Sequence, residues 1–278
     1  MNRSSFGARS GEVTEQIMTG RASSRKAREV SASARVASSA AISSPLSYRK
    51  PVLLSSQLHG KWRLKRRDPA LAAPANAVPL MISEFATASR SYPIVFASDD
   101  ATPLALLRLQ RNNLFLSDGQ WGEGHYVPAY VRRYPFALVP TGTPEGFALA
   151  IDTDSDRVLQ GGEEGDPLFE GEVPGAAINQ ALEFCRLFAG EHHTTQAFGA
   201  ALRSRGLLTG RDISSILSGG RALSLGGFEV VDVDRFTALP EEVVADWHRK
   251  GWLALVSFHL SSVSGFADLL SRQGLRRT

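Results

Sequence analysis

Prolines constrain the first half of this chain more than any other feature. Ten of the 14 prolines in the 278-residue chain lie between residues 51 and 144. Proline lacks a backbone N–H and disrupts the interior of a helix, which argues against long helices here. We therefore predict short strands and turns over residues 48–151, with one short helix at 79–88. The strand-like apolar runs are 92–97, 104–109, 113–116, 126–139 and 146–151. Asp118 and Gly119 separate two apolar runs and predict a hairpin.

The second half of the chain has the spacing of helices. Between residues 175 and 190, apolar residues recur every three or four positions, at 178, 182, 185 and 189. A separate helix is expected over 195–205, with Gly206 as its C-terminal cap. Residues 221–231 are interpreted as a strand of a hairpin. Pro240, followed by two glutamates, marks the start of a last helix. Its apolar stripe is Val244, Trp247, Ala254, Leu255 and Phe258.

An acidic segment separates the two halves. Residues 152–172 contain eight acids, one base and four glycines, which indicates an exposed loop. No linker rich in proline and serine lies beside it, so the halves are expected to share one core. The sequence predicts an α+β fold. A mostly antiparallel β first half (48–151) is followed by an acidic loop (152–174) and a helical second half with a β-hairpin (175–272).

The positive net charge of +3 resides in the first residues of the chain. Residues 1–44 carry seven bases and three acids, many serines and few large apolar side chains. Such a segment buries too little apolar surface to offset the entropy of ordering it. We interpret residues 1–47 as a disordered leader, or as the product of a misassigned translation start. A targeting sequence and a nucleic-acid-binding arm are the alternatives.

The composition excludes several classes of protein. No run reaches the ~20 apolar residues that a membrane span needs. Without a secretory signal either, the expected location is the cytoplasm, with envelope association left open. Cys185 is the single cysteine, which excludes an internal disulfide and zinc sites built on several thiolates.

The metal-like motif in the acidic segment is incomplete. Asp152, Asp154, Asp156 and Glu163 have the spacing of positions 1, 3, 5 and 12 of a calcium loop. However, Arg157 occupies the position where that loop needs glycine, so a solvated loop is the preferred interpretation. We predict no metal and no cofactor.

Catalytic motifs are equally incomplete. Cys185 and His192 lie two helical turns, about 10.5 Å, apart, too far for a thiolate–imidazole pair. His192 and His193 are neighbours and would point in different directions on a helix. No nucleophile elbow or phosphate-binding glycine loop is present. His125, and Asp246 with His248, are candidate acid–base groups only if the protein is an enzyme.

Residues 61–67 form a basic run, with five bases, Trp62 and Leu64. The preferred interpretation is a solvated edge strand or an intramolecular partner of the acidic loop. A protein partner is the second possibility. Nucleic acid is the third and is not expected.

Residues 126–136 contain the most unusual pattern. If the segment is extended, Tyr126, Tyr130, Arg132 and Tyr134 line one side of it. Phenols and guanidinium groups are suited to recognition of a peptide, sugar or carboxylate. We therefore predict a ligand or partner surface, and the alternative is a tyrosine-lined sheet packed under a loop. Its members are Tyr126, Tyr130, Arg132, Arg133 and Tyr134.

At this motif the sequence resembles the SapC family of bacterial proteins associated with the surface layer (S-layer). The resemblance runs from about residue 48 to residue 269. The segments that carry it are 48–51, 76–80 with 84–85, 92–96, 126–136, 166–169, 181–184, 227–232 and 239–240 leading into 247–248. It implies a proteobacterial protein linked to the cell envelope and assigns no reaction.

The leading hypothesis is therefore a non-catalytic accessory or binding protein, with a protein or peptide as its partner. The alternative is an enzyme that acts on a peptide or glycan alongside a cupin-like oxygenase. A closed pocket with His125, Arg132 and a carboxylate would favour the enzyme, and a flat tyrosine surface would favour binding. For a binding surface, Arg132→Ala or Tyr130→Ala is expected to abolish capture without loss of stability.

Overall fold

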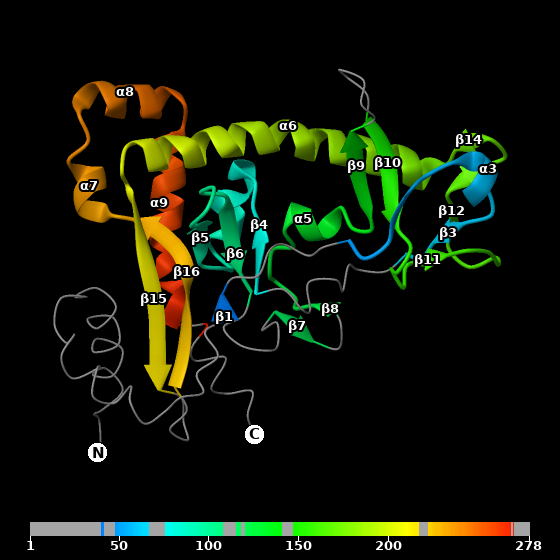
Figure 1. Cartoon of the computed structure of the whole chain (residues 1–278), viewed down its shortest axis with the longest axis horizontal. Helices are drawn as coiled ribbons and strands as arrows, with labels where there is room; N and C mark the ends of the chain where they lie inside the picture. The colour runs from blue at the N-terminus through cyan, green and yellow to red at the C-terminus, as the bar shows by residue number, and fades with distance from the viewer. Residues whose placement is uncertain are drawn as a thin grey trace, which may run out of the picture.

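The computed structural model describes residues 40–41, 48–66, 76–107, 115–117, 120–140, 147–216, 222–267 and 269. These residues form an α+β fold, and the sheets of the first half are antiparallel, as predicted (Figure 1). The two segments of the hairpin around Asp118 and Gly119 pair as expected, while these two residues themselves lie outside the described residues. The leader (1–47) also lies outside them, apart from residues 40–41.

The largest sheet has six strands and is organised around β16. This strand pairs with β15 along one edge, and with β5 and β1 along the other. β6 and β4 continue the sheet beyond β5. The pair of β1 and β16 is parallel. The bounds are β1 Ala40–Ala41, β4 Ala77–Pro79, β5 Ile94–Ala97, β6 Pro103–Leu106, β15 Leu208–Ile216 and β16 Ala222–Val231.

Short strands form the remaining sheets. Two three-stranded sheets have the orders β2-β10-β9 and β11-β3-β12, and two pairs are β13-β14 and β7-β8. The bounds are β2 Pro51–Leu53, β3 Arg63–Leu64, β7 Leu116–Ser117, β8 Gln120–Trp121, β9 Phe136–Pro140, β10 Phe147–Asp152, β11 Val158–Leu159, β12 Asp166–Pro167, β13 Phe169–Glu170 and β14 Val173–Pro174. The frequent prolines and turns keep these strands short, as the sequence indicated.

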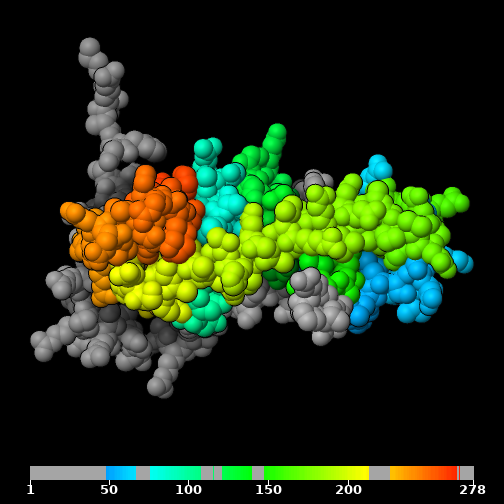
Figure 2. Space-filling model, turned by 90° about the horizontal axis from the view of Figure 1, so that it is seen from above, coloured from blue at the N-terminus to red at the C-terminus, as the bar shows by residue number. Residues whose placement is uncertain are grey.

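One long helix, α6, spans the molecule. The two helices predicted over 175–205 are a single helix of 29 residues, Ala176–Ser204. Gly190 does not interrupt it, because an internal glycine costs a helix only about 1 kcal/mol. The C-terminal cap was predicted correctly, since Gly206 has the left-handed φ of 64°. Figure 2 shows α6, in yellow-green, running along one face of the molecule.

The remaining helices are short. Residues 79–88 contain η1 and α4, in agreement with the expected short helix. The helix predicted after Pro240 is two helices, α8 and α9, because Gly251 has a left-handed φ of 72° and ends the first. The bounds are α3 Ser56–His59, η1 Ile82–Glu84, α4 Phe85–Ala88, α5 Ala129–Arg132, α7 Val233–Thr237, α8 Glu241–Arg249 and α9 Trp252–Val263.

The buried apolar side chains form two clusters, and α6 contributes to both. The larger cluster lies between the six-stranded sheet, α9 and the second half of α6, which contributes Phe198 and Leu202. The smaller one lies under β9 and β10, where the first half of α6 contributes Ile178 and Cys185. The helix therefore links two clusters, where the sequence led us to expect one shared core, and each cluster contains residues of both halves of the chain (Figure 1).

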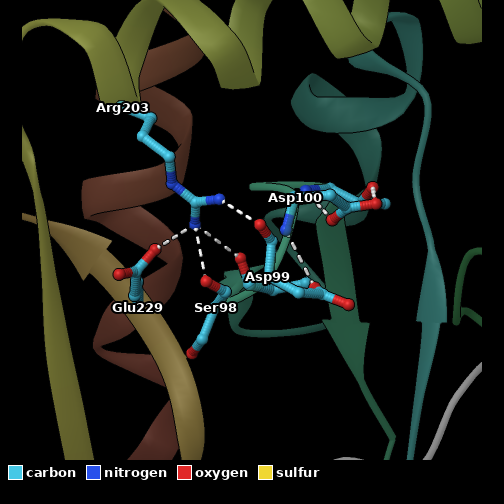
Figure 3. Close-up of polar contacts among 7 residues, drawn as sticks. Ser98, Asp99, Asp100, Arg203 and Glu229 are labelled. Carbon is cyan, nitrogen blue, oxygen red and sulfur yellow. Dashed lines mark hydrogen bonds and ion pairs between the residues drawn. The ribbon is translucent and has the colours of Figure 1, made fainter.

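The end of α6 is fixed to the large sheet by Arg203. Its guanidinium donates to the carbonyl oxygens of Ala97, Ser98 and Asp99 and forms an ion pair of 2.7 Å with Glu229 on β16 (Figure 3). One turn earlier, α6 lies so close to the β5–β6 turn that a Cβ on Gly199 would be 2.4 Å from the Ala101 oxygen. The turn and the helix therefore fit together without room for a side chain.

The basic run and the acidic loop pair with each other. β3, which carries Arg63, lies between β11 and β12 of the acidic segment. Arg66 binds both carboxylate oxygens of Asp166, with a shortest distance of 2.6 Å, and Lys65 lies 3.8 Å from Glu164. The intramolecular interpretation of this run is confirmed.

Candidate functional site

The segment predicted to be a recognition strand is partly helical. Residues 129–132 form α5, so the prediction of a continuous extended chain over 126–139 is wrong. Pro128, with ψ of 143°, starts the helix, because its fixed φ suits the first turn and no N–H is lost there. The alternation of side chains that would have placed four residues on one flat face therefore does not exist. Tyr130 and Val131 turn inward and are 8 % and 0 % exposed.

A buried carboxylate holds α5 in place. Glu84, only 5 % exposed, ends η1. Its two oxygens accept hydrogen bonds from the backbone N–H groups of Met81 and Ala129, both at 2.7 Å, and from the Tyr126 hydroxyl at 2.9 Å. Burial raises the pKa of Glu84, and these hydrogen bonds and the charge of Arg132 oppose that rise. The carboxylate thus fixes the start of α5 and the orientation of Tyr126.

Arg132 lies at the surface above this carboxylate. Its Nε donates to the carbonyl oxygen of Val127, and Nη2 donates to the Tyr126 hydroxyl, both at 3.1 Å. The guanidinium also lies over two rings, with its carbon 5.3 Å from the centre of Phe184 and 5.7 Å from that of Tyr126. Burial and the Glu84 carboxylate raise the pKa of Tyr126 to about 12, so its phenol stays protonated at neutral pH. Arg132 is therefore an exposed cation held in one orientation.

Arg133 is surrounded by aromatic rings. Its guanidinium carbon lies 4.5 Å from the ring centres of Tyr130 and Phe188, and 5.8 Å from that of Tyr48. The side chain is half-buried, and its Nε has no hydrogen-bond partner. Cation–π contacts of this kind stabilise a guanidinium without neutralising its charge.

Tyr134 faces inward and packs in the protein interior, so it does not form part of an accessible surface. It is 6 % exposed, and its hydroxyl lies 3.3 Å from a carboxylate oxygen of Asp152. Burial raises the pKa of Asp152, but hydrogen bonds from the N–H groups of Lys50, Arg49 and Asp154 outweigh it, so that the pKa is lowered. The first acid of the calcium-like motif is thus a buried acceptor that ties two segments together.

The predicted surface residues are close together, but they are not equally accessible. Arg132 is exposed, Tyr126 and Arg133 are half-buried, and Tyr130 and Tyr134 are buried. The accessible side chains are joined by two rings of α6. We call this set the α5–α6 surface, and its members are Tyr126, Arg132, Arg133, Phe184 and Phe188.

The comparison with protein families decides the classification. The SapC family model matches residues 54–269. The chain belongs to the SapC family. Neither the curated proteins nor the solved structures include a significant match to this SapC-family chain. Four of the segments that carry the resemblance contribute residues around α5: Tyr48, Glu84, Tyr126 and Phe184.

Three residues of the site were missed in the sequence. Glu84 lies 42 positions before Tyr126, and no spacing rule connects residues so far apart. Phe184 and Phe188 are one helical turn apart, a pattern that indicates one face of a helix but not what lies against it. Only the packing of α5 on α6 gives these residues their role.

The catalytic and metal-binding candidates do not assemble. Among the described residues, no group of three or more histidine, cysteine, aspartate or glutamate side chains could hold a metal. The ring of His125 packs edge-on against Phe115, and Asp246 pairs with Lys250 and Arg249 rather than with His248. Cys185 is buried, and burial raises the pKa of its thiol. A surface hollow of about 560 Å³ lies instead between Lys65, Arg66, Glu164, Gly165 and Asp166. Its acids and bases pair with one another.

In the described part of the SapC-family chain, no helix has both the length and the apolar character of a membrane span.

Proposed function

We propose that this SapC-family protein is a non-catalytic accessory protein that binds a protein or peptide partner at the α5–α6 surface. Its link to the cell envelope and S-layer is part of the proposal and comes from the family resemblance. A cytoplasmic location, expected from the sequence, is also part of the proposal. The alternative of an enzyme acting on a peptide or glycan is less well supported, because Asp246 pairs with Arg249 and Lys250 rather than with His248, and the His125 ring packs against Phe115.

The observation that carries the proposal is the fixed orientation of Arg132. An exposed arginine normally samples many rotamers, and a partner that binds it must offset that loss of entropy. Here the Tyr126 hydroxyl, the Val127 carbonyl and the Phe184 ring already hold the guanidinium. Tyr126 is in turn fixed by the buried Glu84 carboxylate. Such preorganisation is typical of residues that dominate binding at protein interfaces, among which arginine and tyrosine are enriched.

The chemistry of the surface also favours binding over catalysis. The Glu84 carboxylate is enclosed and accepts three hydrogen bonds, so it does not face a substrate. Tyr126 keeps its proton at neutral pH and is therefore a poor base. What remains accessible is a pair of cations on aromatic rings, which is suited to recognition.

Photo-crosslinking in cells tests this proposal directly. A photoreactive amino acid replaces Leu187, which is 64 % exposed and lies one residue before Phe188. The matched control is Leu58, which is 77 % exposed on α3, far from α5 (Figure 1). We expect one defined adduct from position 187, absent when Arg132→Ala is added, and no such adduct from position 58.

Two results would count against the proposal. Either the same adducts form from both positions, or the adduct from position 187 persists at full yield in the Arg132→Ala background. The first would indicate nonspecific contact, and the second a partner that does not use this surface.

A further inference from the structure

Arg133 is a cation that no acid among the described residues neutralises. Its Nε is buried without a hydrogen-bond partner, and in the part of the chain that the structure describes no acidic side chain forms an ion pair with it. Rings lie around its guanidinium, from Tyr48, Tyr130 and Phe188. A half-buried charge is costly unless it is paired, and aromatic faces compensate for only part of that cost. The charge of the Arg133 guanidinium would be neutralised by an anion.

Two acids at η1 are already engaged. Glu84 accepts three hydrogen bonds below Arg132, and Glu191 accepts a hydrogen bond of 2.5 Å from the Ser83 hydroxyl. Among the described residues, the side-chain partner of the Arg133 guanidinium is the neutral Tyr130 phenol, and no acid forms an ion pair with it. An anion that pairs with it has to come from outside these residues.

Arg132 extends the positive charge along α6. Its guanidinium lies over Phe184, and that of Arg133 lies over Phe188, one helical turn further. Arg132 uses Nε and Nη2 for internal hydrogen bonds, which leaves Nη1 for a ligand. Two guanidinium groups thus follow one another along the same side of the helix, over two aromatic rings.

The backbone around them favours a carboxylate. Both arginines lie at the C-terminal end of α5, where the free backbone groups of a helix are carbonyls and not N–H donors. A tetrahedral phosphate group typically needs several additional donors, whereas a planar carboxylate is satisfied by the two parallel N–H groups of one guanidinium. Carbonyl groups nearby also disfavour a dianion.

We infer that the α5–α6 surface recognises an acidic peptide segment, with an aspartate or glutamate carboxylate bound to Arg133 and a second acid near Arg132. This inference rests on the proposed function and specifies the chemistry of the partner. The rings of Phe184 and Phe188 then contact the apolar part of the same segment.

NMR of the full-length chain tests the primary contact. The Nε–Hε resonance of Arg133, assigned with Arg133→Lys, is followed while acetate or inorganic phosphate is added at constant ionic strength. We expect acetate to shift this resonance more than phosphate does, and the resonance of Arg186 on the opposite side of α6 to stay unchanged. An Arg133 resonance that does not respond to acetate overturns the inference.

Peptide binding tests the specificity. The probe is a short blocked peptide with two glutamates beside a leucine, compared with its glutamine counterpart and with a phosphoserine counterpart. We expect the glutamate peptide to bind at least about tenfold more tightly than the glutamine peptide, and Arg133→Gln to remove that difference. Arg186→Gln is the matched control, roughly 200° around α6 from Phe184. Because Arg133 also packs on rings, the unfolding temperature of each variant is measured alongside.

The outcomes separate this inference from the proposed function. Equal binding of the glutamate and glutamine peptides, or binding of the phosphoserine peptide alone, overturns the carboxylate inference. If the crosslink from position 187 still depends on Arg132, the proposed binding function stands with a different partner chemistry. If both the crosslink and the peptide binding fail, the surface is not a binding site.

Discussion

The backbone N–H of Val231 donates a hydrogen bond of 3.0 Å to Nε2 of His259. On the other side of the ring, Nδ1 lies 2.9 Å from the carbonyl oxygen of Ile94 and donates its proton there. β16 and β5 pair at Phe228 with Ala97 and at Glu229 with Phe96, and the same register would place Val231 opposite Ile94. The imidazole therefore stands between two strand residues that would otherwise pair directly, and it fixes α9 to both strands.

This position makes the stability of the protein sensitive to acid. Burial lowers the pKa of His259 from 6.5 to about 4, so the folded state binds its proton only below the pH at which the unfolded state does. The contribution of the neutral His259 ring to the free energy of unfolding is complete above pH 6.5, and it is lost as the pH falls toward 4. From this group alone, we expect the free energy of unfolding to decrease by about 3 kcal/mol over that interval.

Urea unfolding at a series of pH values measures this effect, with His259→Gln as the comparison. Glutamine can accept from Val231 and donate to Ile94, and it does not titrate. The difference between the two chains should shrink as the pH falls from 6.5 to 4. Parallel pH profiles would show that His259 does not titrate as described.

Glu84→Gln should destabilise the fold and change its pH dependence in the opposite sense. The amide group presents N–H donors where the carboxylate accepted, so a buried N–H of Met81 or Ala129 loses its acceptor. We expect a loss of about 1–3 kcal/mol at pH 7. Because burial raises the pKa of Glu84, the wild-type chain gains stability relative to the variant as the pH falls through that pKa.

Chemical unfolding of both chains provides the measurement, and Glu183→Gln on the exposed side of α6 is the control. An unchanged free energy of unfolding in Glu84→Gln would mean that the carboxylate does not anchor α5.

Two glycines of α6 should respond to alanine with opposite signs. A Cβ at Gly199 would lie 2.4 Å from the Ala101 oxygen, so Gly199→Ala forces the helix away from the β5–β6 turn. We expect a loss of about 1–3 kcal/mol. No atom lies within 4 Å of a Cβ at Gly190, and Gly190→Ala should add up to about 1 kcal/mol of helix stability. Thermal unfolding of the two variants tests both signs, and a stabilised Gly199→Ala would contradict the close contact.

Alanine substitutions of Arg132 and Tyr130 should differ in their effect on stability. Arg132 is exposed, so Arg132→Ala should change the free energy of unfolding by less than about 1 kcal/mol. Tyr130 is 8 % exposed and packs in the larger cluster, so Tyr130→Ala should cost about 3 kcal/mol or more. The sequence alone suggested that both variants would leave stability intact, and the burial of Tyr130 corrects this. Calorimetry of the two variants is the measurement, and a marginal loss for Tyr130→Ala would indicate an accessible ring.

Features governed by local chemistry could be predicted from the sequence. The prolines of the first half limited it to short strands, Gly206 ended α6, and Pro240 started α8. The opposite charges of residues 61–67 and the acidic loop also indicated their pairing. In each case, a property of the residues themselves excludes the other conformations or pairings.

Features governed by packing could not be predicted in the same way. The local sequence does not decide whether residues 176–204 form one helix or two. Gly251 and Pro128 each permit a helix boundary, but neither requires one. Propensities at such positions differ by less than about 1 kcal/mol per residue, whereas burial of a large side chain contributes about 1.5–3 kcal/mol.

The candidate site shows the same division. The sequence by itself determined that tyrosines and arginines are concentrated between residues 126 and 134. The tertiary structure decided which of them are accessible, because it turned Tyr130 and Tyr134 inward and left Arg132 outside. It also brought Glu84 to Tyr126 across 42 residues, a contact that exists only because η1, α5 and α6 bury their apolar faces against one another.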